Sequence, residues 1–335
     1  MSGVGLCTDP RFFDHDTGRG HPERPARLDA VLSGIRDRGL LERVVAVEPR
    51  LATNAEIIAV HDPAMTTAIE ALSRRGGGRI DDDTVQSVGS WEAASLAAGA
   101  GLTCISAIDD GLVDRAFCVV RPPGHHATPS TPMGFCLLNN VAIAAAHLAG
   151  RGERVVICDI DAHHGNGTQD AFYADPNVLF VSWHQWPFYP GTGAASQSGA
   201  GPGLGTTINV PLPAGATGDR YRDSFDQVVG PAIEAFRPDW ILISAGFDAH
   251  RADPLTDLAL TAGDVAAITA DIVAAAPDPR RVLAFLEGGY DLEALAECSA
   301  AFLAVLSGSP IATEPTTSDG TGAREIELFT SRHRR

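Results

Sequence analysis

Short apolar runs alternate with alanine-rich or amphipathic segments along most of the chain. Runs without a polar face, which are typical of strands buried in a parallel sheet, occur at 4–7, 116–121, 155–158, 178–183, 206–210, 239–244 and 282–286. The segments between them predict helices at 26–38, 53–59, 64–72, 91–108 and 141–148. This alternation predicts an α/β fold with a parallel sheet that is covered by helices on both faces.

The alternation continues without a linker-like break as far as Ser307, so we predict one domain at 1–307. From Gly308 on, Pro, Thr, Ser and Gly dominate, and we expect 308–335 to be a polar, mobile tail outside the core. No apolar run reaches the length of a membrane span, and the N-terminus lacks the features of a signal peptide. These features predict a cytoplasmic protein without a membrane partner.

The composition of the chain limits the kinds of partner that we expect it to bind. The chain of 335 residues is 44% hydrophobic, enough for a sizeable core, and its net charge is −17. That charge argues against nucleic acid as a partner and favours cationic molecules or lysine-rich segments. The six cysteines form no Cys-x-x-Cys pair, and several lie in apolar runs, as reduced core cysteines do.

Polar side chains are most concentrated after the run at 155–158, where Asp159, Asp161, His163, His164 and Asn166 follow closely. In an α/β sheet, ligands bind beyond the carboxyl ends of the strands. On an extended backbone Asp161 and His163 point the same way and supply two of the three protein ligands of a catalytic zinc. The alternative is a polar turn that contains Gly165 and Gly167.

Other predicted strands also end in residues with metal-binding or acid–base chemistry. These residues are His125, His126, Asp248 and Tyr290. If the strands are neighbours, Asp161, His163 and Asp248 complete a three-ligand site with an open position for water. Such a set suits zinc and also admits iron(II), cobalt or manganese. Taken singly, each residue could instead cap a loop or a helix, or pack as a loop aromatic.

Seven motifs together resemble the zinc-dependent histone deacetylase superfamily. They are His21-Pro-Glu-Arg-Pro25, Arg121-Pro-Pro-Gly-His-His126, Gly134-Phe-Cys136, Asn139-Asn140, Asp159-Ile-Asp-Ala-His-His-Gly-Asn-Gly-Thr-Gln169, Ser244-Ala-Gly-Phe-Asp248 and Glu287-Gly-Gly-Tyr290. The resemblance runs from about residue 3 to 305 and is greatest to the class II branch, with bacterial histone deacetylase-like and acetylpolyamine amidohydrolases. It implies the arginase-deacetylase fold, a three-layer α/β/α domain around a mostly parallel eight-stranded sheet.

The same resemblance implies the site residues. One Zn²⁺ per chain would be held by Asp161, His163 and Asp248, with His125, His126 and Tyr290 as catalytic residues. A structural K⁺ site would include Asp159 and Ser182. The substrate channel would be lined by Gly134, Phe135, Tyr189, Leu255 and, by a looser alignment, Asp83.

The tandem histidines are expected to differ in charge. By the resemblance, His125 pairs with Asp159, and His126 pairs with Asn166. A carboxylate partner favours the charged imidazole of His125, whereas an amide partner leaves the pKa of His126 near 6.5. We therefore predict that His126 is the general base and that His125 is an electrostatic helper.

The predicted reaction is hydrolysis of an amide that releases acetate, or another short acyl acid, from an acylated amine. Leu255 stands at the channel rim without a glutamate nearby, so we expect acetyl-lysine peptides to be cleaved at least as well as acetylated polyamines. The alternatives are an acetylpolyamine amidohydrolase, a binuclear manganese ureohydrolase and a non-catalytic binder of acyl amines. The ureohydrolase would need further carboxylates in the stretch His164-Gly-Asn166 and at His250. The sequence is compatible with a homo-oligomer.

Overall fold

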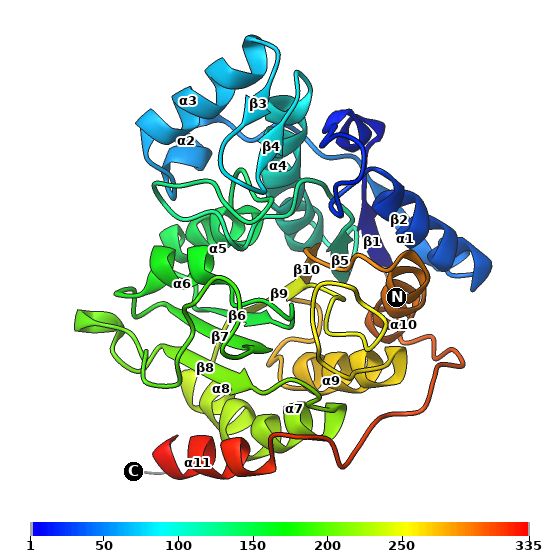
Figure 1. Ribbon diagram of the computed structural model, residues 1–335, viewed down its shortest axis with the longest axis vertical. Helices are drawn as coiled ribbons and strands as arrows, with labels where there is room; N and C mark the ends of the chain where they lie inside the picture. Colours follow the sequence, from blue (N-terminus) through cyan, green and yellow to red (C-terminus); the bar gives the residue numbers. More distant parts are fainter. Residues whose placement is uncertain (1–2, 334–335) are drawn as a thin grey trace.

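Parallel strands form the centre of the computed structural model, which describes residues 3–333 (Figure 1). Within these residues, eight strands form one sheet in the order β2-β1-β5-β10-β9-β6-β7-β8, and every pairing is parallel. They are β1 (Val4–Cys7), β2 (Val44–Val47), β5 (Arg115–Cys118), β6 (Val155–Asp159), β7 (Val178–Gln185), β8 (Thr207–Leu212), β9 (Trp240–Ala245) and β10 (Val282–Leu286). The central strands are buried along their length because helices cover both faces, so their apolar runs need no polar side.

Two groups of helices cover the sheet, one on each face (Figure 1). One group comprises α1 (Ala26–Asp37), α7 (Gly218–Ser224), α8 (Gly230–Phe236), α9 (Ala262–Ala274) and α10 (Leu292–Leu306). The other comprises α4 (Ser90–Asp109), α5 (Asn140–Gly150) and α6 (Asn166–Phe172), with α2 (Asn54–Ile58) and α3 (Pro63–Arg74) beside them. Short 3₁₀ turns occur at Pro10–Asp14, Leu41–Arg43 and Gly201–Gly203, and a π-helical turn, Phe225–Val229, joins α7 to α8. The prediction of an α/β fold with a parallel sheet is confirmed.

Helix α4 packs closely on the sheet because its residues are small. A Cβ on Gly101 would lie only 2.4 Å from the ring of Phe285 in β10. Contrary to the sequence expectation, this helix of 20 residues is long and apolar enough to cross a membrane by length and composition alone. Its most apolar window is 78% buried inside the protein, as in a core helix.

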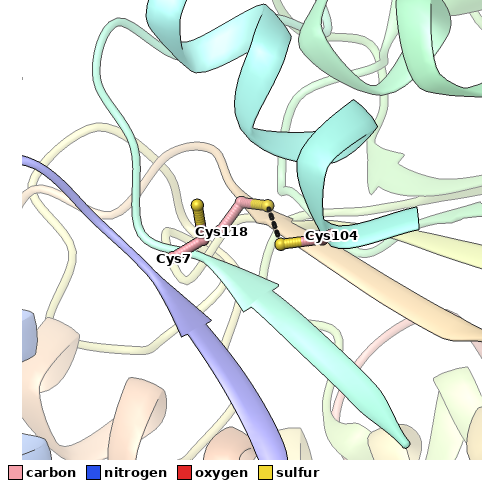
Figure 2. A group of neighbouring side chains, drawn as sticks. All are labelled: Cys7, Cys104 and Cys118. Carbon is pink, nitrogen blue, oxygen red and sulfur yellow. Dashed lines mark hydrogen bonds between the residues drawn. The ribbon is translucent and has the colours of Figure 1, made fainter. Parts of the chain in front are cut away.

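Three cysteines gather where α4 meets the carboxyl ends of two neighbouring strands (Figure 2). Cys7 and Cys118 are paired residues at the ends of β1 and β5, so their side chains lie on the same face of the sheet. Cys104 approaches from α4, with its Sγ 3.7 Å from the Sγ of Cys118. All six cysteines are buried free thiols, in agreement with the sequence interpretation.

Smaller differences from the expected elements lie at edges and loops. The sequence analysis did not predict β2, a four-residue edge strand that is apolar throughout but exposed at its two central residues. The run at 116–121 is a strand only as far as Cys118. Residues 78–86, which matched no predicted element, form an antiparallel hairpin between β3 (Gly78–Arg79) and β4 (Val85–Gln86).

The prediction that residues 308–335 lie outside the core is wrong for the part that the structure describes. Helix α11 (Ala323–His333) packs against α7 and β8, and its Ile326 and Phe329 are each only 4% exposed. Upstream, the backbone N–H and the hydroxyl of Thr317 both donate to the buried carboxylate of Asp264 in α9, at 2.9 and 2.7 Å. The polar composition hid these contacts because they are made by single residues.

Candidate active site

Two carboxylates and one imidazole converge beyond the carboxyl ends of β6 and β9. His163 Nδ1 lies 3.2 Å from Asp161 Oδ1 and 3.0 Å from Asp248 Oδ2. One donor atom from each residue lies within 4.8 Å of the other two, and all three residues are buried. The predicted ligand set is therefore assembled in space, with the hard oxygen and nitrogen donors that suit a zinc ion.

Missing side chains at two glycines make room for these carboxylates. A Cβ on Gly246 would lie 2.0 Å from Asp161 Oδ2, and a Cβ on Gly288 would lie 2.2 Å from Asp248 Oδ2. The backbone N–H of Gly288 instead donates to Asp161 Oδ2 at 2.8 Å, and that of Ala162 donates to Asp248 Oδ1 at 2.7 Å. The backbone N–H of His163 also donates to Asp161 Oδ1 at 2.8 Å, so backbone donors hold both oxygens of Asp161 and one oxygen of Asp248.

The electrostatics of the three-residue set favour a positive charge between the carboxylates. Burial lowers the pKa of the His163 imidazole, but the carboxylates of Asp161 and Asp248 outweigh burial and raise this pKa to about 10. Burial, and then repulsion by the nearby carboxylate of Asp161, raise the pKa of Asp248. A cation among these donors relieves that repulsion, so the residues present fit a divalent metal ion.

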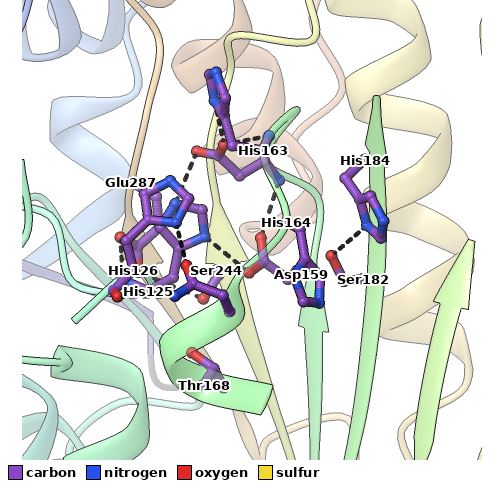
Figure 3. Close-up of polar contacts among 12 residues, drawn as sticks. His125, His126, Asp159, His163, His164, Thr168, Ser182, His184, Ser244 and Glu287 are labelled. Atoms are coloured by element: carbon purple, nitrogen blue, oxygen red, sulfur yellow. Dashed lines mark hydrogen bonds and ion pairs between the residues drawn. The ribbon is translucent and has the colours of Figure 1, made fainter. Parts of the chain in front are cut away.

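The tandem histidines lie beside this set and have different partners (Figure 3). His125 Nδ1 lies 2.9 Å from Asp159 Oδ2, whereas His126 Nδ1 lies 2.8 Å from Asn166 Oδ1. The amide nitrogen of Asn166 donates to the carbonyl oxygen of His126 at 3.4 Å, which leaves its oxygen facing the imidazole. His126 Nδ1 is therefore the protonated nitrogen, and Nε2 carries the free lone pair.

The pKa values of the two imidazoles diverge in the predicted direction. Burial lowers the pKa of His125, but nearby carboxylates, chiefly those of Asp159 and Asp161, outweigh burial and raise it well above its usual value. Burial and the positive charges of His125 and His163 hold the pKa of His126 well below its usual value. The expectation that His126 stays near 6.5 was wrong, because sequence did not show its full burial or its charged neighbours.

Tyr290 follows β10 and faces the same site. Its ring lies 5.8 Å from the ring of Phe135, edge to face, and the guanidinium of Arg27 lies 5.1 Å from its centroid. Arg27 also donates to the carbonyl oxygens of Gly289 and Glu287, which fixes the turn that carries the tyrosine. Burial raises the pKa of Tyr290 well above its usual value, so its hydroxyl stays a hydrogen-bond donor.

A cavity of about 250 Å³ leads to these groups. Its lining consists of Asp83, His126, Gly134, Phe135, His163, Phe188, Tyr189, Leu255 and Tyr290. All five residues that the sequence assigned to a channel are among them. Gly134 has φ +56°, and a Cβ there would lie 2.5 Å from the ring of His126, so only glycine fits. The wall is largely aromatic.

Several supporting residues escaped sequence reasoning. The sequence assigned Tyr189 to the channel but not its neighbour Phe188, whose ring lies 5.7 Å from that of His163. Glu287 Oε2 accepts from the backbone N–H groups of Gly124 and His125 at 2.6 and 3.1 Å. Its place in the run Glu287-Gly-Gly-Tyr290 was the available signal.

Two histidines near the ligand residues turn away from the cavity. His164 lies against the loop after β7, with Nδ1 2.8 Å from Thr192 Oγ1. His250 Nε2 contacts Glu314 Oε2 at 3.0 Å.

Asp159 and Ser182 are paired residues of β6 and β7, and the hydroxyl of Ser182 lies 2.9 Å from His184 Nδ1 (Figure 3).

Comparison with known proteins agrees with this geometry. The histone deacetylase domain family matches residues 21–306. A probable deacetylase from Archaeoglobus fulgidus is 41% identical over 311 residues, covering 91% of this chain and 86% of the relative. The chloroplastic histone deacetylase 10 of Oryza sativa subsp. japonica is 38% identical over 325 residues, covering 91% and 73%. The crystal structure of the HDA15 HD domain superposes with a TM-score of 0.91 at 35% identity, covering 99% of this chain and 94% of that one. The chain therefore belongs to the histone deacetylase family and is a deacetylase, a hydrolase that acts on amide bonds.

Proposed function

We propose that the protein removes acetyl groups from acylated amines of the acetyl-lysine type, with one zinc ion held by Asp161, His163 and Asp248. The observation that carries this proposal is the convergence of these donors beside one cavity that His126, His163 and Tyr290 line. A bound zinc ion supplies a Lewis acid that polarises the acyl carbonyl and lowers the pKa of water. His250 contacts Glu314 rather than the ligand residues, which favours one metal over the binuclear manganese alternative.

In this proposal His126 takes the proton from water. Its Nε2 carries the free lone pair, and its depressed pKa keeps the imidazole neutral before the reaction. His125 stays charged beside Asp159 and stabilises negative charge that develops near it. The Tyr290 hydroxyl donates to the carbonyl oxygen as that oxygen becomes negative. A protonated histidine then supplies the proton that the departing amine needs.

The channel supports a substrate with an apolar tether and a polar mouth. The rings of Phe135, Phe188 and Tyr189 line the cavity and suit a methylene chain such as that of lysine. Asp83 lines the same cavity and can accept a hydrogen bond from a substrate amide or attract a cationic amine. This acidic residue and the net charge of −17 also favour acetylpolyamines, the second candidate substrates.

The substrate test compares kcat/KM for an acetyl-lysine peptide, acetylputrescine and acetylspermidine on one preparation. We expect the peptide to be cleaved at least as well as either polyamine, because no glutamate stands beside Leu255. A preference of about a hundredfold for a polyamine, about 2.7 kcal/mol in transition-state binding, would contradict this assignment.

The metal assignment is tested separately. Asp161→Ala, His163→Ala and Asp248→Ala should each abolish both zinc retention and turnover, since each removes one of three protein ligands. A variant that keeps full zinc and activity removes its residue from the set. We also propose that Asp159 and Ser182, buried and paired across β6 and β7, help to hold a structural K⁺ ion. Replacing K⁺ with a large organic cation should then lower the thermal midpoint.

A further inference from the structure

Asp253 lies in the loop between β9 and α9, and its carboxylate collects hydrogen bonds from two separate parts of the site. Oδ1 accepts from the backbone N–H of Leu255 at 2.9 Å, at the rim of the cavity. Oδ2 accepts from the backbone N–H of Tyr290 at 2.7 Å and from that of Asp291 at 3.3 Å. One side chain thus joins the channel rim to the turn that carries the tyrosine.

Nothing in the environment of Asp253 stabilises it as an ion pair. The residue is only 6% exposed, and within residues 3–333 no cationic side chain forms a salt bridge with it. Burial and the negative charge of Asp248 raise the pKa of its carboxyl to about 7 despite the three backbone donors. A buried carboxylate without a cation costs stability. The hydrogen bond to the backbone of Tyr290 suggests that the carboxylate is present for function rather than for stability.

We propose that Asp253 is a positioning residue that holds Tyr290 in the orientation from which its hydroxyl reaches the substrate carbonyl. Its carboxylate holds the tyrosine backbone, while Arg27 and Phe135 contact the ring. The inference rests on the proposed function, since it acts through the hydroxyl of Tyr290. An acid is required because three N–H donors converge on two oxygens. An asparagine offers one oxygen and would turn its NH₂ group toward at least one donor.

The consequence for catalysis is a loss in kcat rather than in substrate binding. A displacement of about 1 Å at a catalytic group can cost on the order of a hundredfold in rate. We therefore expect Asp253→Asn to lower kcat at least about tenfold on an acetyl-lysine peptide, with a smaller change in KM. Asp253→Ala removes all three contacts and should cost more.

A double-mutant cycle with Tyr290→Phe separates positioning from general stability. Tyr290→Phe alone should lower kcat about a hundredfold, as for one lost oxyanion donor. If Asp253 acts through that hydroxyl, Asp253→Asn should cost less than about twofold in the Tyr290→Phe background. A merely structural aspartate would cost the same factor in both backgrounds.

Asp264 provides the matched control. It is a buried carboxylate that also accepts from two backbone N–H groups, those of Thr261 and Thr317, both at 2.9 Å, yet it does not line the cavity. Asp264→Asn should lower the thermal midpoint without a change in kcat in either background. Thermal midpoints and zinc content are measured for every variant. Asp253→Asn, which nearly preserves side-chain volume, supports the test if Asp253→Ala does not fold.

The outcomes distinguish this inference from the proposed function. If Tyr290→Phe is fully active, the proposed role of the tyrosine fails and the inference fails with it. If Tyr290→Phe is impaired but Asp253→Asn has wild-type kcat, or costs the same factor in both backgrounds, the proposed function stands and Asp253 is not a positioning residue. A loss of kcat that disappears in the Tyr290→Phe background supports the inference.

Discussion

Replacing Gly288 or Gly246 with alanine should disrupt the metal site although neither glycine is a ligand. A Cβ on Gly288 would lie 2.2 Å from Asp248 Oδ2 and 2.6 Å from Asp161 Oδ2, whereas ordinary contacts begin at 3.4 Å. The nearer carboxylate oxygen would therefore have to retreat by roughly 1.2 Å. Metal–ligand distances tolerate deviations of only about 0.2 Å. Neither glycine has a positive φ, so the expected effect comes from the added atom alone.

We expect zinc affinity to fall at least about a hundredfold, or about 2.7 kcal/mol, since one ligand is displaced. Overpacking should also lower the free energy of unfolding by about 1–3 kcal/mol. Zinc retained after dialysis, measured by atomic emission, and zinc affinity by competition with a chelator are the primary assays. Thermal midpoints show whether each variant is folded.

Gly150→Ala is the matched control for this substitution. Gly150 ends α5, has no positive φ, and a Cβ there would meet nothing within 4 Å. It should keep wild-type zinc content and activity. A folded Gly288→Ala protein with full zinc affinity and wild-type kcat/KM would refute the assignment of Asp161 and Asp248 as ligands.

Three further predictions test other parts of the molecule. At equal zinc content, His126→Ala should lower kcat by more than His125→Ala does, because only His126 is neutral and able to accept a proton; the reverse order in activity assays would exchange their roles. The pKa of Glu287 is raised to about 7, chiefly by burial, so its contribution to stability is present below about pH 4.5 and is lost as pH rises through 7. Glu287→Gln should therefore flatten the pH dependence of unfolding in that window, and an unchanged urea titration series would contradict this. Deleting residues 308–335 should lower the free energy of unfolding by about 3–6 kcal/mol, because Ile326 and Phe329 lose their burial; an unchanged denaturation midpoint would show that α11 does not stabilise the fold.

The residues proposed as metal ligands could be located from sequence by two simple rules. Apolar runs without a polar face mark buried strands, and parallel strands place their carboxyl ends at one edge of the sheet. The residues that follow β6 and β9 were expected to meet if these strands were neighbours, and the two strands are paired in the sheet. The strand order was not predictable from the runs alone. Neighbours such as β5 and β10 are far apart in sequence and are selected by long-range packing.

The supports of the site were hidden for a different reason. Glu23 pairs with Arg27 and Arg121 in a fully buried cluster, although the last of these is distant in sequence. A charge in a sequence predicts solvent exposure, and only the folded chain shows that its partner is buried beside it. For the same reason, residues 308–335 were wrongly predicted to lie outside the core. Glu314 in this segment reaches His250 and Arg251 in the loop after Asp248.

Several buried acids around the cavity must be stabilised by groups from many parts of the chain. These acids are Asp159, Asp161, Asp248, Asp253 and Glu287. Such a set would be unstable in an apolar core, because burying an isolated charge costs several kcal/mol. Two imidazoles, His125 and His163, have raised pKa values and offset part of the charge, and backbone N–H groups from the loops after β5, β6 and β10 offset more. The remaining negative charge favours a divalent cation, so binding a metal and completing the fold lower the same electrostatic cost.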